Sequence, residues 1–244
     1  MKTMRISIPI LFTILFSLII SEKSRAQLEV SWDALRTHSV DFNTEYGKEE
    51  GAVYYWQVTG GTTTDLLNVT ASSVDIIWDG DPGEYELSVF VVDGNGCQSE
   101  TIIQKINVLD ESTLLFEDEA SSPVLCSVLS EEITSGLDQI IFTVNFNSGI
   151  APYSLTYRIV DSDNNLYDNQ GNPSTENIVE NGIATSTYEI KIENGFLNDT
   201  DQDQVYKVEI LEAKTSDGAN VTLDENMQIF TICKKPMIQN LKMH

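Results

Sequence analysis

Short segments in which every second residue is apolar are the feature that most constrains what this chain can fold into. The clearest is the segment 84–91, in which Tyr85, Leu87, Val89 and Val91 stand at every second position. Because side chains alternate between the two faces of a β-strand, these four residues are expected to share one buried face. No stretch after residue 26 keeps the i, i+3, i+4 apolar period of an amphipathic helix. The pattern therefore predicts an all-β protein.

Seven such segments between residues 27 and 110 predict a first sandwich of the immunoglobulin type. The strands are expected at 28–32, 39–43, 53–59, 66–70, 73–78, 84–92 and 101–109. Turn-forming residues at 79–83 and 93–96, rich in Asp, Asn and Gly, separate the last three strands.

A second sandwich is expected over residues 123–236. Its strands are predicted at 124–128, 139–146, 153–160, 176–180, 185–193, 205–213, 220–223 and 228–233. Asn181-Gly182 predicts a hairpin turn, and residues 130–137 have room for one helical turn. Acidic and small residues before Pro123 predict a linker over 111–122, and residues 237–244 are expected to form a frayed tail.

Three ordered segments of the first domain resemble a known family. They read YWQVTGGT from Tyr55, PGEYELSV from Pro82 and VDGNGC from Val92. Together they resemble the landmarks of a polycystic-kidney-disease (PKD-like) domain over residues 27–110, although Gln57–Gly61 stands where the family often has an aspartate-containing turn. The resemblance implies a β-sandwich used as a spacer, adhesion or binding module in exported proteins. The Asn-Gly-Cys ending is similar to modules of gliding-type Gram-negative bacteria, whereas the second domain is immunoglobulin-like by pattern alone.

The first 26 residues have the pattern of a secretory signal peptide. Lys2 and Arg5 precede an apolar run from 6 to 20, and Ser24 and Ala26 supply small residues before a cleavage point at Gln27. The alternative is a retained membrane anchor, but Pro9 interrupts the run, which is shorter than the roughly 18 residues that a spanning helix needs. We therefore expect an exported protein of the periplasm or cell surface.

The formal charge of the chain limits its partners. The net charge is −24, and removal of residues 1–26 takes away four positive residues and one negative residue, which leaves −27. Such a surface repels phosphate backbones and anionic headgroups, so neither nucleic acid nor acidic membrane is expected as a partner. Divalent cations and basic protein surfaces are favoured, and solubility alone is the alternative explanation of the acidity.

The sequence predicts no enzyme. Its two histidines, His38 and His244, are not placed to serve a nucleophilic triad, and no nucleophile elbow, zinc-helix or phosphate-loop motif is present. Paired carboxylates for glycoside hydrolysis are the remaining catalytic alternative, but a chain with 38 acidic residues contains such pairs by coincidence.

Two acidic loops of the second domain are candidate calcium ligands. Oxygen-bearing side chains stand at alternate positions, an arrangement that lets a turning backbone direct several of them at one hard cation. The residues are Asp161, Asp163 and Asn165 in one loop and Asp199, Asp201 and Asp203 in the other. The alternative is a pair of solvated turns. The predicted strand order brings both loops to one end of the sandwich, which is expected to be a functional edge.

The three cysteines allow at most one intramolecular bridge. Cys126 and Cys233 lie near the start and the end of the second domain, so a disulfide between them is predicted, with Cys97 left over. The alternative is three buried thiols. Trp56 is expected in the first core, while Tyr54 and Tyr55 are either partly covered or a platform for sugar rings.

The sequence therefore predicts a non-enzymatic extracytoplasmic structural or protein-binding module. A role as an accessory to a surface, adhesion, gliding or secretion apparatus is implied by the resemblance alone. The alternative function is a calcium-assisted carbohydrate-binding protein.

Overall fold

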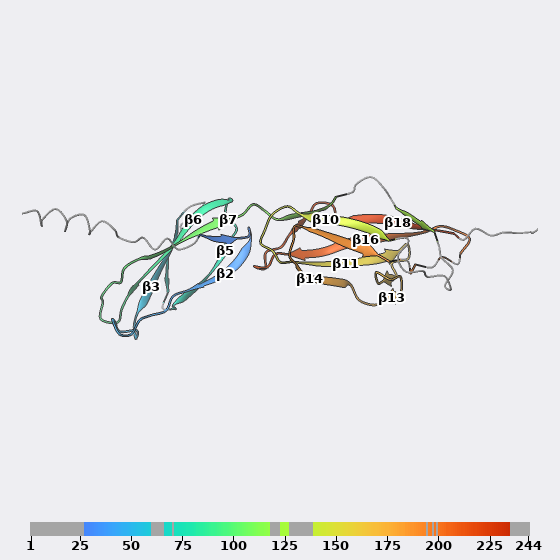
Figure 1. Cartoon of the computed structure of the whole chain (residues 1–244). Coiled ribbons are helices and arrows are strands. Elements are labelled where there is room, and N and C mark those ends of the chain that lie inside the picture. The colour runs from blue at the N-terminus through green and yellow to red at the C-terminus, as the bar shows by residue number, and fades with distance from the viewer. Residues whose placement is uncertain are drawn as a thin grey trace, which may run out of the picture.

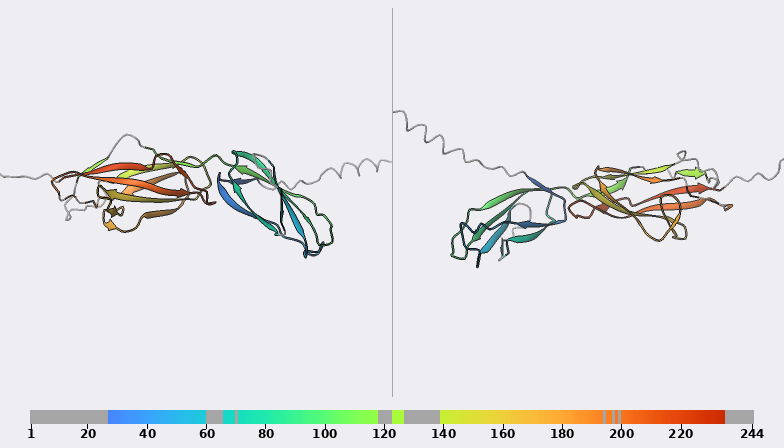
Figure 2. Two further views of the ribbon diagram at one scale, coloured as in Figure 1. Left: turned by 180° about the vertical axis from the view of Figure 1, so that it is seen from behind. Right: turned by 60° about the horizontal axis from the view of Figure 1, so that its bottom comes forward.

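The computed structural model describes residues 27–59, 66–69, 71–117, 123–126, 139–193, 195–196, 198 and 200–234. Within these residues all regular secondary structure is β, which confirms the predicted fold class. The strands form two immunoglobulin-like sandwiches that lie end to end (Figures 1 and 2). No helix that could span a membrane occurs in the described part of the chain.

The first sandwich has two sheets of unequal size. The larger has the order β1-β7-β6-β3-β4 and consists of β1 (Leu28–Val30), β3 (Val53–Thr59), β4 (Leu66–Val69), β6 (Gly83–Val92) and β7 (Ile102–Val108). The smaller pairs β2 (Ala34–Ser39) with β5 (Ser73–Trp78). All pairs are antiparallel except β1 with β7.

The second sandwich faces a four-stranded sheet with a seven-stranded one. The smaller sheet, in the order β15-β10-β8-β17, consists of β8 (Thr113–Phe116), β10 (Ile140–Phe146), β15 (Thr187–Ile192) and β17 (Thr222–Leu223). The larger has the order β13-β12-β11-β16-β18-β9, with β14 also paired to β11. Its strands are β9 (Val124–Cys126), β11 (Tyr153–Asp161), β12 (Leu166–Tyr167), β13 (Pro173–Ser174), β14 (Ile178–Ile183), β16 (Gln204–Lys214) and β18 (Met227–Cys233).

Each sandwich encloses its own apolar core, built from the alternating residues of its strands. In β6, Tyr85, Leu87 and Val89 are buried as predicted, and Val91 packs against the same core. Each fully buried aliphatic or aromatic side chain stabilises the fold by about 1.5–3 kcal/mol. The alternation of the sequence therefore decides which face of each strand enters the core.

Two sequence-based assignments are wrong in detail. The second strand is Ala34–Ser39 rather than 39–43, because the inward positions of β2 include Arg36 and His38, which an apolar pattern misses. Thr113–Phe116, placed in the linker, forms β8, whose Leu114 and Phe116 are buried in the second core. The expected helical turn at 130–137 lies outside the described residues.

The predicted hairpin at Asn181-Gly182 is also wrong. Both residues lie within β14, and β14 and β15 belong to different sheets. Gly182 has a φ of 77°, and the register of β14 against β11 shifts at this point, from Tyr153 opposite Ile183 to Ser154 opposite Asn181. The positive φ that suits a hairpin turn is used here in a bulge instead.

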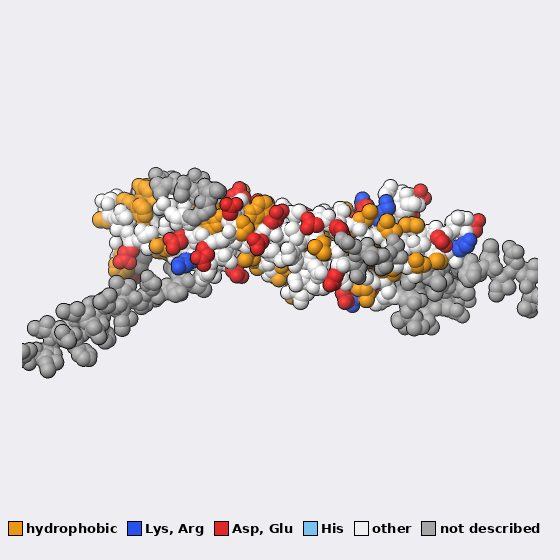
Figure 3. All heavy atoms as spheres, turned by 90° about the horizontal axis from the view of Figure 1, so that it is seen from above, with side chains coloured by type: hydrophobic (Ala, Val, Ile, Leu, Met, Phe, Trp, Pro, Cys, Tyr) orange, Lys and Arg blue, Asp and Glu red, His pale blue; other side chains and the backbone are white. Residues whose placement is uncertain are grey.

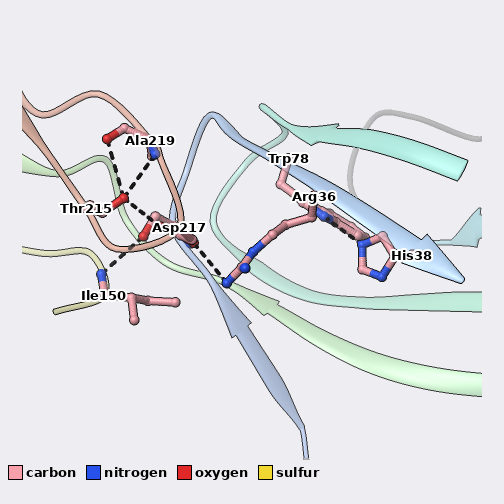
Figure 4. Close-up of polar contacts among 8 residues, drawn as sticks. Arg36, His38, Trp78, Ile150, Thr215, Asp217 and Ala219 are labelled. Carbon is pink, nitrogen blue, oxygen red and sulfur yellow. Dashed lines mark hydrogen bonds and ion pairs between the residues drawn. The ribbon is translucent and has the colours of Figure 1, made fainter. Parts of the chain in front are cut away.

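The two sandwiches meet at a turn of the second one that carries a buried carboxylate (Figure 4). Asp217 Oδ2 accepts the amide of Ser31, at 2.8 Å, and lies 3.7 Å from Nη2 of Arg36. Asp217 Oδ1 accepts the hydroxyl of Thr215 from its own turn, at 2.5 Å. A second hydrogen bond joins the same two sandwiches: Ser31 Oγ accepts the backbone amide of Ile150, at 3.1 Å.

Apolar packing adds to this junction. Ala219, which follows the same turn of the second sandwich, is 1% exposed and belongs to the core cluster of the first sandwich. The chain passes between the sandwiches through the short segment 109–112, since β7 ends at Val108 and β8 begins at Thr113. A buried carboxylate, a shared core residue and a short connection together fix the orientation of the two sandwiches.

Candidate functional site

The first sandwich has two open strand edges that face the same gap. β2 pairs with β5 along one edge, and no described strand pairs with its other edge. β7 pairs with β6 over its whole length, but β1 covers only Ile106–Val108 on the other side. Ile102 and Ile103 of β7 therefore have an edge beside which no described strand lies.

Residues on the inward face of β7 lose their cover at this gap. Ile106 and Val108 are buried, and Ile102 lies on the same face because side chains alternate. Ile102 is nevertheless 39% exposed. An inward-facing isoleucine with this exposure marks a place where no described strand covers the core of the sandwich.

Two adjoining cavities lie at this gap, the smaller between β2 and the start of β7 and the larger beside the segment 40–47 that follows β2. One has a volume of about 720 Å³ and the other of about 320 Å³, and Val40, Val89 and Ile102 line both. We call the combined space the β2–β7 groove. Its further apolar lining is Leu28, Phe42, Tyr54, Trp56, Leu87, Phe90 and Val91.

The groove carries negative charge. Asp41, Asp93 and Glu100 line it, and its described lining contains neither lysine nor arginine. Backbone amides of Cys97 and Lys48 donate to the Asp93 carboxylate and lower its pKa. The wider surface has the same sign, since acidic side chains outnumber basic ones on the face shown in Figure 3.

His38 stands beside the groove and packs on the buried Trp78. The rings meet edge to face with centroids 5.8 Å apart, and Trp78 Nε1 donates to His38 Nε2 at 3.4 Å. Burial first, and then the charge of Arg36, lower the pKa of His38 below its ordinary value. The hydrogen bond requires an unprotonated Nε2, so the folded state holds the imidazole neutral.

This environment makes the first sandwich sensitive to acid. Because the folded pKa of His38 is lowered, the stability it contributes is present above its unfolded pKa of about 6.5 and is lost as the pH falls through the lowered value. In His38→Gln, the urea midpoint of unfolding is expected to depend less on pH between about pH 5 and 7. His244→Gln is the matched control and should keep the slope of the unmodified protein; an equal slope in all three proteins would contradict the expectation.

The first acidic loop uses its carboxylate to close its own turn. Asp161 Oδ1 accepts the amides of Asp163 and Asn165, each at 2.9 Å. Its Oδ2 accepts Asn165 Nδ2 at 2.8 Å and the hydroxyl of Tyr167 at 3.1 Å. Desolvation raises the pKa of Asp161, but the donors from Asn165, Asp163 and Tyr167 outweigh it, so the pKa is lowered. A cation would have to displace these hydrogen bonds.

The same turn occurs twice more. Asp168 Oδ1 accepts the amides of Gln170 and Asn172, and Asp93 Oδ1 accepts those of Asn95 and Cys97. In each turn an aspartate accepts the amides two and four residues later, which is the local bonding that makes Asp a turn former. The alternate spacing of oxygen-bearing residues in the sequence thus belongs to turns that an aspartate carboxylate closes by hydrogen bonds.

The second acidic loop lies at the same end of the sandwich as the first, as the sequence predicted. In the register of β11 against β16, Asp161 is opposite Tyr206, three residues after Asp203. Asp203 Oδ1 accepts the amide of Lys234 at 2.9 Å, and Asp201 is exposed. Asp199 lies outside the described residues. Among the residues that are described, no cluster of three or more acidic, histidine or cysteine side chains suits a metal ion, and calcium binding stays a prediction.

The backbone places two of the cysteines next to each other. β9 runs parallel to β18 with Cys126 opposite Cys233. Neighbouring strands are about 4.8 Å apart, which is within the Cα separation that a disulfide spans. The bridge remains a prediction, and Cys97 is exposed on the first sandwich.

Of the aromatic residues of β3, Trp56 lies where the sequence predicts and Tyr54 is more deeply buried than expected. Trp56 and Tyr54 are buried in the first core, and Tyr55 points to the other face of the sheet. There Tyr55 stacks on Phe90 with ring centroids 4.7 Å apart. This pair is partly exposed and is the surface that the carbohydrate alternative would use.

Sequence reasoning missed the groove and the junction. The groove arises because no described strand lies beside the free edge of β2 or the start of β7. The pattern of residues within a strand does not show whether another strand pairs with it. Asp217 stands in the sequence Thr-Ser-Asp-Gly, which reads as an ordinary exposed turn. Only the packing of the two sandwiches shows that its side chain is buried.

Comparisons with known proteins identify no family for this chain. No family model matches the chain, and no curated protein matches it. Among solved structures, the fibronectin(III)-like modules of Clostridium thermocellum CbhA are 13% identical with a TM-score of 0.33, covering 91% of this chain and 98% of that one. The FN1–FN3 domains of chicken CNTN1 are 14% identical with a TM-score of 0.37, covering 87% of this chain and 64% of that one. The strand pairing described above, and not these distant likenesses, carries the immunoglobulin-like assignment; PKD-like membership of residues 27–110 stays a prediction.

Proposed function

We propose that this protein is an exported, non-enzymatic module that binds a protein partner in the periplasm or at the cell surface through the β2–β7 groove. The observation that carries the proposal is the pair of open edges at β2 and β7, with the inward-facing Ile102 left uncovered between them. A role as an accessory to an adhesion, gliding or secretion apparatus is the finer form of the same proposal.

The chemistry of the groove favours an extended peptide segment. A free strand edge offers backbone donors and acceptors, and an added strand presents alternate side chains to one face. The groove is apolar at its floor, where Val89 and Trp56 lie, and acidic at Asp41 and Glu100. The segment that fits has apolar residues at alternate positions and carries Lys or Arg rather than Asp or Glu.

The second sandwich is proposed to act as a stem. Its turn at Thr215–Ala219 contacts the first sandwich near Ser31, so the groove is held in a fixed orientation relative to the second sandwich. A binding surface on a rigid stem is placed at a defined distance and angle from whatever holds the other end. This arrangement suits a structural or adhesive role better than a free linker would.

A photo-crosslinking amino acid at position 102 or 103 tests the proposed surface in the native cell envelope. Ile102 lies in the groove, whereas Ile103 is 50% exposed on the opposite face of β7, so the two positions form a matched pair. We expect a protein adduct from position 102 and not from position 103. The same adduct in Tyr55→Ala would separate this surface from the carbohydrate alternative; equal labelling from both positions, or none, would contradict the proposal.

A further inference from the structure

The segment that follows β18 has a composition unlike that of the rest of the exported chain. Residues 234–244 read KKPMIQNLKMH and contain three lysines, one histidine and no acidic residue. Residues 27–233 contain seven lysines and arginines against 37 acidic residues. The short segment is therefore basic, while the two sandwiches that precede it are strongly acidic.

This segment also has the alternation that the groove would accept. Met237, Leu241 and Met243 stand at odd positions, with Gln239 between them. In an extended strand these side chains would share one face. Unbranched methionine side chains adapt well to irregular apolar spaces. The β2–β7 groove supplies such a space, with carboxylates at Asp41 and Glu100 and no cationic side chain among the described residues that line it.

The groove of the same molecule is out of reach. β18 runs antiparallel to β16, and Ile232 is opposite Gln204, the first residue of β16. The other end of β16 leads into the turn that contacts the first sandwich. Since β16 has 11 residues, β18 ends about 35 Å from the junction between the sandwiches.

The groove itself lies farther away, towards the outer end of the first sandwich. β7 ends at the junction with Val108, so Ile102 is about 20 Å beyond it, and the turn at Asp93–Cys97 is more distant still. Ten residues span at most about 35 Å when fully extended. Residues 235–244 therefore cannot cross both distances, and the groove that they can enter belongs to another copy.

We propose that residues 235–244 of one copy enter the β2–β7 groove of a second copy as an added strand, so that copies join head to tail. This inference rests on the proposed function of the groove and names its partner. β18 ends at one end of the molecule and Ile102 lies towards the other, so the contact joins two different surfaces. A head-to-tail contact leaves a free groove and a free segment at the ends of each pair, so it continues into rings or linear assemblies.

The sedimentation of the exported protein over a range of concentrations tests the proposal. We expect a mass that grows with concentration beyond that of a dimer. Ile102→Arg places a charge in the groove and Leu241→Asp places one on the apolar face of the segment, and each is expected to weaken association by about tenfold or more. Ile103→Arg and Asn240→Asp introduce the same charges on the opposite faces and should associate like the unmodified protein.

A mixture of the two weakened variants distinguishes the head-to-tail contact from other modes of association. Ile102→Arg retains a usable segment and Leu241→Asp retains a usable groove, so an equimolar mixture should form a dimer of one copy of each and nothing larger. Growth of the mixture beyond a dimer, or equal association of Leu241→Asp and Asn240→Asp, would overturn the head-to-tail contact. A strictly monomeric protein that still gives the adduct from position 102 in the envelope would overturn the self-assembly alone and leave the proposed function standing.

Discussion

Replacing Asp217 with alanine is expected to lower the free energy of unfolding by about 3 kcal/mol and to uncouple the two sandwiches. The substitution leaves the buried amide of Ser31 without its acceptor and removes the closer of two acceptors of the Thr215 hydroxyl. A buried donor without an acceptor costs about 1–3 kcal/mol. The ion pair with Arg36 adds little, because the Arg36 side chain is 37% exposed.

Small-angle scattering and calorimetry measure this effect together. In the unmodified protein the fixed junction should give one narrow distribution of particle dimensions. In Asp217→Ala we expect a broader distribution and a separate, earlier unfolding transition of the first sandwich, whose core loses the support of Ala219. Asp217→Asn is the matched control: it keeps an acceptor oxygen and should lose about 1 kcal/mol. Unchanged scattering from Asp217→Ala would show that the connection through residues 109–112 fixes the orientation alone.

How much of the fold could be predicted depends on which side chains face inward. β6 was predicted closely because Tyr85, Leu87 and Val89 alternate with polar residues and fill the core. The predicted position of β2 is several residues too late in the chain, because the inward face of this strand carries Arg36 and His38. Their partners, Asp217 and Trp78, are distant in sequence. A pattern of apolar residues detects burial by the hydrophobic effect and does not detect burial by polar pairing.

The candidate site shows the same limit. The sequence predicts correctly that the loops at Asp161 and Asp203 lie at the same end of the second sandwich, since the directions of successive strands decide where their loops emerge. It could not show that the Asp161 carboxylate is already occupied by donors from Asn165 and Tyr167. Nor could it show the β2–β7 groove, because a groove depends on how far β1 extends along β7, and that is a matter of strand register.

Joining Cys126 to Cys233 by a disulfide is expected to stabilise the exported protein by about 4–5 kcal/mol relative to the double variant Cys126→Ser, Cys233→Ser. The parallel register of β9 and β18 places the two backbones opposite each other, so the bridge requires no rearrangement of the strands. It would close a loop of roughly 100 residues, and the entropy that such a loop removes from the unfolded chain accounts for the size of the effect. An exported protein meets the oxidising conditions in which the bond forms and persists.

Intact-mass measurement before and after reduction, combined with chemical unfolding, checks this expectation. The oxidised protein should have one alkylatable thiol in denaturant, Cys97, and should gain two more on reduction. Cys97→Ser is the control and should unfold like the unmodified protein, because Cys97 is exposed on the other sandwich. The bridge would also tie β9 to the strand from which residues 235–244 emerge, so its reduction should loosen the point where the proposed assembly begins. Three alkylatable thiols in the protein recovered from the envelope would show that β9 is held to β18 by strand pairing and packing alone.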